Sequence, residues 1–510
     1  MNNAQRGELG LVLVWIASAL AGGFHYFPYR DDWVYLGWAA RWPTGRWGFY
    51  VAHGLYGYRP LSFLVDVEVW SRFWPHATIP WAIVMALMLA AALAGRRLIA
   101  RTTGRPFWLG TAMILLWPGA VEGQYWIAAA SGIVLSLAAA VAAGWALAWA
   151  AEGRGRGWWW AAGLALLAAD LSYEQIWGPG VVLTLAVVVH YRQPLRRALA
   201  VAVTPLVLTG AWYVAQRATL AGNGKDPVRS WAAFHAEATL VDGHFAALWG
   251  QVVWQAFAQA FAAPAMGWSW WLLIGGGTSL VMLTARQGGA SAAPPAAVWM
   301  GLGLAWMVAS VAPWYGTTYG WVSVRSVATT VVGLGFMAEG LLLWLAAHGA
   351  RWAPELLALL VGAMLVSGAS LRAEDVHAYQ VTGQMDRVVA ARILSAFSAH
   401  GVHHGAVALG TPVLRWVPWL YPFADHITST ASFGPALQVM LGDLTHGRDT
   451  LTFVPPGTPP PPHATGIAIV ATPVRSHTIQ VSGVSRGVVI RVSLHPRPRV
   501  VQVLWEGPAT

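Results

Sequence analysis

The sequence predicts a polytopic α-helical membrane protein of about eleven spanning helices, and three observations lead to this fold class. Hydrophobic residues make up 57% of the 510 residues and charged residues only 10%, whereas an ordinary soluble domain carries about 25% charged residues. Most of the chain consists of apolar runs of roughly 17 to 25 residues with few charges. A bilayer core of about 30 Å requires this length of a spanning helix. Arginines gather between these runs, as in the short cytoplasmic loops of membrane proteins.

The apolar runs, taken in chain order, give the predicted spans. They are continuous rather than alternating, which favours helices over a β-barrel. The first run also has small residues, Ala19 and Ala21, of the kind found at signal-peptide cleavage sites, but an uncleaved helix keeps the later topology consistent. The spans are expected at 9–27, 77–95, 107–121, 127–150, 157–171, 175–191, 196–216, 266–285, 296–313, 323–347 and 353–371.

The net charge of +10 is interpreted as a topology signal and not as a sign of a nucleic-acid partner. Arginines cluster at 96–105, 154–156 and 192–197, between apolar runs. The positive-inside rule assigns such loops to the cytoplasm. We therefore expect a multi-pass protein of the plasma membrane with a cytoplasmic N-terminus and an extracytoplasmic C-terminal part.

Two domains are expected. Residues 1–372 form the membrane domain, with long outer loops at 28–76 and 217–265, and residues 61–74 have the mixed pattern of a helix lying in the membrane interface. Residues 373–510 form a small C-terminal α+β domain outside the membrane, with a helix at 377–399 and a stiff proline segment at 455–462. Its strands are expected at 467–471, 478–481, 488–494 and 500–505.

Cysteine is absent from the sequence, which excludes disulfides, thiol nucleophiles and thiolate metal sites. The sixteen histidines form no recognised metal-binding spacing. No cofactor is therefore indicated by the residues alone.

Candidate functional residues gather at the outer ends of the predicted helices. Asp31 and Asp32 follow the first helix, and adjacent carboxylates near aromatic rings at a membrane surface are expected to have perturbed pKa values, which suits a general base. The alternative is that the two acids only end the helix. Arg59 opens the expected interfacial helix, where its guanidinium can hold a phosphate bidentately or simply reach the lipid headgroups.

The later outer loops add further charged and aromatic side chains. Acids at the ends of membrane helices are functional hypotheses by default, and cations on the same side would let one outer cavity combine carboxylates with phosphate-binding groups. A salt-bridge network that holds helix ends together is the competing interpretation. The residues concerned are Glu122, Tyr125, Trp126, Asp170, Glu174, Arg217, Lys225 and Arg325.

An ordered set of short motifs resembles the membrane glycosyltransferases of the GT-C fold, in the superfamily of the protein mannosyltransferases and aminoarabinose transferases. The likeness covers about residues 8–220. The motifs are Asp31 and Asp32 after the first helix, Arg59-Pro60-Leu61, Tyr125-Trp126-Ile127 with Ser131, and Leu171-Ser172-Tyr173-Glu174.

The resemblance implies an enzyme that takes a sugar from a polyprenyl phosphate carrier and passes it, with inversion, to a glycan, lipid or protein acceptor outside the membrane. Asp31 or Asp32 corresponds to the catalytic base, and Glu122 to a second acid whose role involves the acceptor or a divalent metal, so metal dependence stays open. The segment 129–132 lacks the arginine and acid of some relatives, which leaves the donor sugar open. Residues that would bind substrate are Arg59, Tyr125, Trp126, Glu174, Arg217, Lys225 and Arg325.

Two other classes of function are weighed against this one. A transporter or flippase is expected to carry ionisable residues near the bilayer midplane, and here the acids crowd the outer ends of helices instead. Glu339, inside a predicted span, is the exception and belongs either to an internal pair or to a transport path. A non-catalytic assembly protein of the cell envelope is the third class.

Overall fold

The structure is a computed structural model that describes most of the chain as two compact units. One unit contains residues 1–24 and 42–376, and the other contains residues 25–41 and 377–510. The described residues are 3–20, 23–57, 59–105, 107–117, 122–222, 296–315, 328–349, 352–399, 401, 403–409, 429–430, 433–448, 450–453, 465–473, 491–492 and 499–506.

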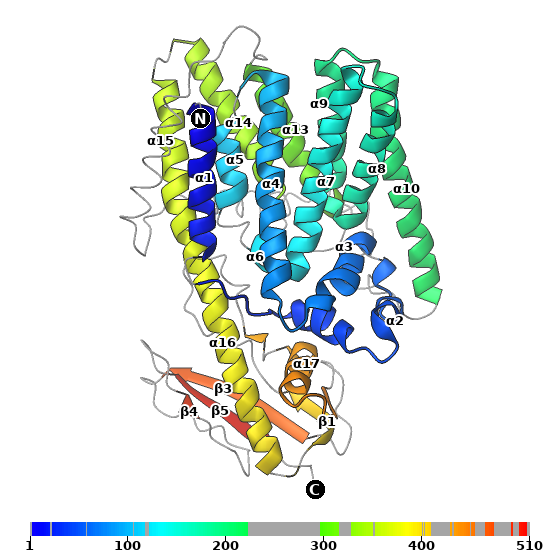
Figure 1. The fold of residues 1–510 in the computed structure, drawn as a ribbon, viewed down its shortest axis with the longest axis vertical. Helices are drawn as coiled ribbons and strands as arrows, with labels where there is room; N and C mark the ends of the chain where they lie inside the picture. The colour runs from blue at the N-terminus through cyan, green and yellow to red at the C-terminus, as the bar shows by residue number, and fades with distance from the viewer. Residues whose placement is uncertain are drawn as a thin grey trace. The chain divides into compact units, whose positions relative to one another are not determined.

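Helices make up the first unit, and their apolar composition leads them to pack side by side (Figure 1). Its longer helices are α1 (Asn3–Leu20), α4 (Thr78–Thr103), α7 (Ile127–Ala151), α8 (Gly157–Ser172), α9 (Trp177–His190), α10 (Leu195–Gly222), α13 (Ala296–Tyr315), α14 (Thr330–Ala347) and α15 (Ala353–Ala363). Shorter helices are α2 (Gly45–Ala52), α3 (Pro60–Leu64), α5 (Trp108–Leu116) and α6 (Glu122–Tyr125). Helix α7 packs between α4 and α8, and α8 in turn packs against α10.

The described part of the chain contains five helical segments that are long and apolar enough to cross a membrane: Thr78–Thr103, Ile127–Ala151, Leu195–Gln216, Thr330–Ala347 and Glu355–Ala399. Shorter apolar helices occupy Glu174–His190 and Ala296–Val311. By length and composition these segments confirm the predicted class, a helical membrane protein.

Helices lie at the other expected spans too, with differences at their ends. The expected span 107–121 is occupied by the shorter α5, because Trp117 adopts an extended backbone with ψ 124°. Trp117 precedes Pro118, and a residue before proline is disfavoured in the helical region. The span expected at 266–285 lies outside the described residues.

The second unit combines the segment 25–41 with a long helix and a mixed sheet. Helix α16 (Ala369–Ala399) continues from α15 through the π-helical turn Met364–Gly368, so the expected break near residue 371 is absent and the helix passes from the first unit into the second. The five strands have the order β2-β1-β3-β5-β4, and α17 (Gly434–Leu444) packs against β2. The strands are β1 (His404–Leu409), β2 (Thr450–Phe453), β3 (Thr465–Pro473), β4 (Arg491–Val492) and β5 (Arg499–Glu506).

Strand register follows from the alternation of side chains along each strand. β1 runs parallel to both β2 and β3, with Val407 opposite Phe453 and Thr465. β3 and β5 are antiparallel, with Ile467 opposite Trp505. The strands expected at 467–471 and 500–505 are found. Of the strand expected at 488–494, the described part is β4, and 478–481 lies outside the described residues. Sequence analysis missed β1 and β2.

Candidate functional site

Arg59 lies at the centre of the polar cluster in the first unit. Its backbone is left-handed, with φ 49° and ψ 54°, and Pro60 follows at the first position of α3. A left-handed residue other than glycine costs roughly 1 to 3 kcal/mol and is found disproportionately at functional sites. Two hydroxyls hold this turn: Tyr213 accepts from the Arg59 backbone N–H at 3.1 Å, and Tyr50 donates to the Pro60 carbonyl at 2.9 Å.

The Arg59 side chain makes a bidentate pair with Glu174. Its Nε donates to Glu174 Oε2 at 2.8 Å and its Nη2 to Oε1 at 2.5 Å, and only 12% of each side chain is exposed. The guanidinium also lies 4.1 Å from the centre of the Tyr173 ring. A fork-to-fork pair stacked on an aromatic ring fixes both the position and the plane of the guanidinium.

Glu174 is presented by the short connection between α8 and α9. Tyr173 has an extended backbone at the end of α8, and a 3₁₀ turn covers Glu174–Ile176. The Asp170 carbonyl accepts from Trp177 Nε1 at 2.9 Å, which ties the end of α8 to the start of α9. The side chain of Asp170 itself is 2% exposed.

Tyr50, on α2, has a pKa above its ordinary value because burial disfavours the phenolate and neighbouring Tyr56 adds to the effect. The phenol therefore stays protonated at any physiological pH. Its hydrogen bond to Pro60 is consequently insensitive to pH.

Three segments of the ordered motif set meet around Gly132 of α7. A Cβ at Gly132 would lie 3.1 Å from the Tyr173 ring, 3.3 Å from the Ser172 carbonyl and 3.5 Å from Ser62 Oγ, so α3, α7 and the end of α8 pack closely around a residue without a side chain. One residue earlier, Ser131 Oγ accepts from Trp70 Nε1 at 2.9 Å. The three segments lie far apart in the sequence and form one packed corner of the first unit.

Asp31 and Asp32 belong to the second unit and differ in environment. Asp32 is fully buried; its Oδ2 accepts from the Tyr29 backbone N–H at 2.9 Å and from the Tyr26 hydroxyl. Asp31 is partly exposed. Hydrogen bonds to the charged form of a carboxylate favour that form, so Asp32 serves as a fixed acceptor that shapes the turn.

The segment that carries both aspartates is held by α16 and by residues 429–430. Thr430 Oγ1 accepts from the Arg30 backbone N–H at 3.2 Å. The Thr430 N–H in turn donates to Asp386 Oδ2 at 2.7 Å, and Ser429 donates to the other Asp386 oxygen. Asp386 is fully buried in α16. Sequence reasoning missed this acid, because nothing in its local pattern distinguishes it from a surface residue of an amphipathic helix.

The same segment makes further contacts within the second unit. Tyr29 and Tyr379 meet edge to face at 5.2 Å between ring centres, Gln380 donates to the His25 carbonyl at 2.9 Å, and Arg41 pairs with Asp443 of α17. The aspartates thus depend on residues more than 340 positions later in the chain for their local backbone geometry.

Tyr125 and Trp126 are buried and pack inside the first unit, with the Tyr125 ring 5.8 Å from that of Trp81. Their neighbour Gln124 accepts a hydrogen bond from the fully buried Arg372, whose guanidinium lies 5.1 Å from the Trp15 ring. The sequence analysis did not predict this contact between Gln124 and Arg372. Glu122 begins α6, and its side chain lies outside the described residues.

The remaining predicted cations are not described at the level of side chains. Arg217 lies within α10 without a described side chain, and Lys225 and Arg325 lie outside the described residues. Tyr213, four residues before Arg217, was missed although it is a polar aromatic residue in an otherwise apolar run, a recognisable signal.

Glu339 has a structural partner. Its Oε1 accepts from the backbone N–H groups of Leu109 at 2.8 Å and Gly110 at 3.3 Å, at the start of α5. Helix N-termini leave such donors unsatisfied, and a carboxylate there is favoured by the helix dipole. Of the two interpretations given above for Glu339, the internal partner is the one seen.

Among the described residues, no group of three or more histidine, aspartate or glutamate side chains could hold a metal ion. Comparisons of the chain with models of known protein families, with curated proteins and with solved structures find no match. The functional assignment therefore depends on the geometry above and on the motif resemblance.

Proposed function

We propose that this protein is a membrane glycosyltransferase that transfers a sugar from a polyprenyl phosphate carrier to an acceptor on the outer side of the plasma membrane. In this proposal about eleven helices span the membrane and the C-terminal α+β part is extracytoplasmic. The supporting observation is the corner at Gly132, where three motif segments that carry the resemblance to GT-C enzymes pack together around Arg59.

The chemistry requires a base for the acceptor hydroxyl and cations for the departing phosphate. Base catalysis by a positioned carboxylate contributes roughly 10² to 10⁴ in rate, and fixed cations stabilise the developing charge of the phosphate. Arg59 is the cation we assign to the carrier phosphate. It is held by Glu174 on one side and Tyr173 on its face, so its guanidinium is preorganised and costs no rearrangement when phosphate charge develops.

We assign the proton transfer to Asp31 and a positioning role to Asp32. Asp31 is partly exposed, whereas the Asp32 carboxylate is buried and accepts hydrogen bonds from the Tyr29 N–H and the Tyr26 hydroxyl. A single displacement by the acceptor oxygen breaks the bond from the anomeric carbon to the phosphate oxygen, and the acceptor proton passes to Asp31. The phosphate leaves with the bonding electron pair.

Paired aspartate variants test the two roles. Asp31→Asn should reduce transfer by roughly 10² to 10⁴ with the thermal unfolding midpoint unchanged, whereas Asp32→Asn should lower that midpoint as well as the activity. Transfer from a polyprenyl-phosphate-sugar to a soluble acceptor analogue is the activity measured. Full activity of Asp31→Asn would overturn the assignment of the base.

Native mass spectrometry of the purified chain tests the carrier separately. We expect wild-type protein to retain an added polyprenyl phosphate and Arg59→Ala to lose it. No retention by wild-type protein would contradict the proposed donor and favour the transport or assembly classes.

A further inference from the structure

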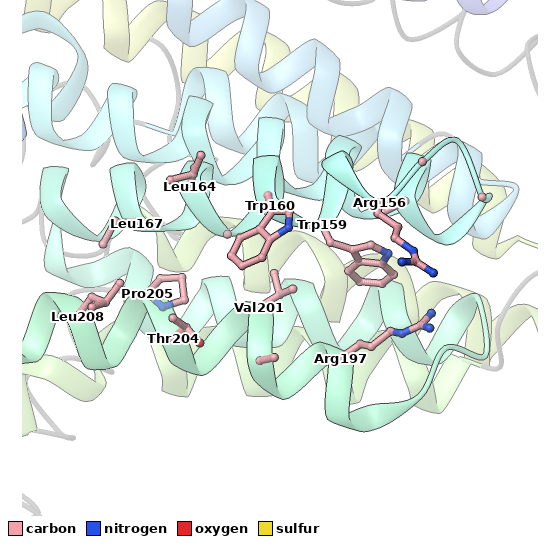
Figure 2. A pocket seen from close by; sticks show the side chains of 15 residues that line it. Arg156, Trp159, Trp160, Leu164, Leu167, Arg197, Val201, Thr204, Pro205 and Leu208 are labelled. Atoms are coloured by element: carbon pink, nitrogen blue, oxygen red, sulfur yellow. The ribbon is translucent and has the colours of Figure 1, made fainter.

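A groove of about 730 Å³ runs along the surface of the first unit between α8 and α10. Figure 2 shows its wall: apolar side chains from the two helices face one another along its length, and two arginines lie together at one end. Trp160 and Leu164 of α8 are 78% and 66% exposed, and Leu208 of α10 is 52% exposed. An exposed apolar face of this kind marks contact with a membrane or with a partner.

The two arginines at the end of the groove have no acidic partner in the described part of the chain. Arg156 directly precedes α8. Arg197, in the first turn of α10, donates to Gln193 at 3.2 Å and lies 5.9 Å from the Trp159 ring. Four other arginines of the first unit do have an acidic partner, each glutamate being shared by two of them. Arg101 and Arg154 pair with Glu152, and Arg96 and Arg97 pair with Glu8.

The length of the groove matches one leaflet. From Arg156 to Leu167 on α8, and from Arg197 to Leu208 on α10, the lining covers eleven residue steps, which is roughly 16 Å of helix. Half of a bilayer core of about 30 Å is nearly the same depth. The positive-inside rule assigns the arginine end to the cytoplasm.

We propose that this groove binds one anionic phospholipid of the cytoplasmic leaflet. Its phosphate lies between Arg156 and Arg197, and one acyl chain lies along Trp160, Gly163 and Leu208. Basic pockets between membrane helices on the cytoplasmic side are suited to anionic headgroups, and the uncompensated charge of +2 here complements a phosphate. The site is separate from the proposed sugar-transfer residues and does not depend on that activity.

Charge and depth favour this occupant over two others. A second copy of the chain would have to bring acids against the two arginines, whereas an anionic phospholipid carries its phosphate at headgroup depth. A polyprenyl phosphate has a tail far longer than one leaflet, whereas the groove ends at the midplane.

Native mass spectrometry of the full chain tests the proposal, with dioleoylphosphatidylglycerol as the anionic probe and dioleoylphosphatidylcholine as the zwitterionic one. Wild-type protein should retain the anionic lipid about tenfold more tightly than the zwitterionic one, and Arg156→Gln with Arg197→Gln should remove the preference. The matched control, Arg192→Gln with Arg196→Gln, removes the same amount of charge between α9 and the first turn of α10, at residues that do not line the groove. This control should keep the preference for the anionic lipid.

A second variant probes the tail. A Cβ at Gly163 meets nothing within 4 Å, so Gly163→Leu places an apolar side chain in the groove and should weaken retention of the anionic lipid about tenfold. Gly301→Leu on α13, also in open space, is its control. Unchanged retention in Gly163→Leu would overturn the groove as the tail site.

Other results would also overturn the proposal. Equal retention of the two lipids by wild-type protein would remove the charge argument. Displacement of the lipid by millimolar inorganic phosphate would indicate a site for free phosphate. A doubled mass that depends on Arg156 and Arg197 would assign the groove to a second copy, and preferential exchange for polyprenyl phosphate would assign it to the carrier.

Discussion

At the scale of single residues, Arg59 shows how neighbouring groups can fix the position and orientation of a charged side chain. Its left-handed backbone, the bidentate bond to Glu174 and the stacked Tyr173 ring fix one guanidinium in one plane. Lysine presents a single flexible ammonium and cannot reproduce a fork or a stack. Arg72, which is 64% exposed and pairs with Glu68 one turn away at 3.5 Å, is an ordinary surface ion pair by contrast.

Arg59→Lys should therefore destabilise the protein by about 1 to 3 kcal/mol, because it removes charge-assisted hydrogen bonds from a mostly buried pair. Arg72→Lys should change stability by less than about 0.5 kcal/mol. Thermal unfolding of both variants in the same detergent measures the difference. Equal midpoints for the two variants would mean that the Arg59–Glu174 pair is not structurally important.

At the scale of elements, two glycines allow one close approach between helices α13 and α14. Within the first unit, a Cβ at Gly303 of α13 would lie 2.6 Å from the Gly333 carbonyl of α14, and a Cβ at Gly333 would lie equally close to the Gly303 carbonyl. Reciprocal glycines let the two backbones touch, as small residues do in many membrane helix pairs.

Gly303→Ala should cost about 1 to 3 kcal/mol, since the added methyl group forces the two helices apart. Gly301→Ala, two residues away on the same helix and facing open space, should be neutral or stabilising by up to about 1 kcal/mol, because alanine is the better helix former. The comparison of their unfolding midpoints isolates the close approach from the change in helix propensity. A neutral Gly303→Ala would contradict this packing.

Within the second unit, α16 anchors the segment that carries Asp31 and Asp32, through Asp386. Asp386→Asn removes the charge from the acceptor of two hydrogen bonds, which should cost about 1.5 to 3 kcal/mol. We expect faster amide hydrogen exchange in peptides from residues 25–41, because Thr430 also holds the Arg30 N–H. Arg392→Gln, on an exposed position of the same helix, should leave exchange in these peptides unchanged; a similar rise in both variants would refute a specific anchor.

At the scale of the whole molecule, the chain lends itself to a direct test of topology because it contains no cysteine. Single cysteines at Gly157, at the arginine-rich start of α8, and at Arg448, just after α17, occupy exposed positions. A membrane-impermeant maleimide should label Arg448→Cys in intact cells and Gly157→Cys only after permeabilisation. Labelling of Gly157→Cys in intact cells would reverse the proposed orientation.

The sequence by itself determined the class of the protein and the positions of most of its helices. A spanning helix satisfies its own backbone hydrogen bonds and needs about 20 apolar residues in a row, so the signal is local and strong. The same local reasoning found the strands around Ile467 and Trp505, where β-branched residues are dense. It missed β1, whose His404–Leu409 sequence is rich in small residues and becomes a strand only between β2 and β3.

Tertiary structure alone decided the partners of the candidate residues. Arg59 and Glu174 are 115 positions apart, and Arg30 and Thr430 are 400 apart, so no local pattern could pair them. The sequence pointed to Arg59, Glu174 and the two aspartates as chemically unusual at helix ends, but Tyr213, Asp386 and Arg372 emerged only in the fold. The length of an apolar run can be read from consecutive residues, whereas the environment of a charged side chain depends on which distant residues the packed helices place beside it.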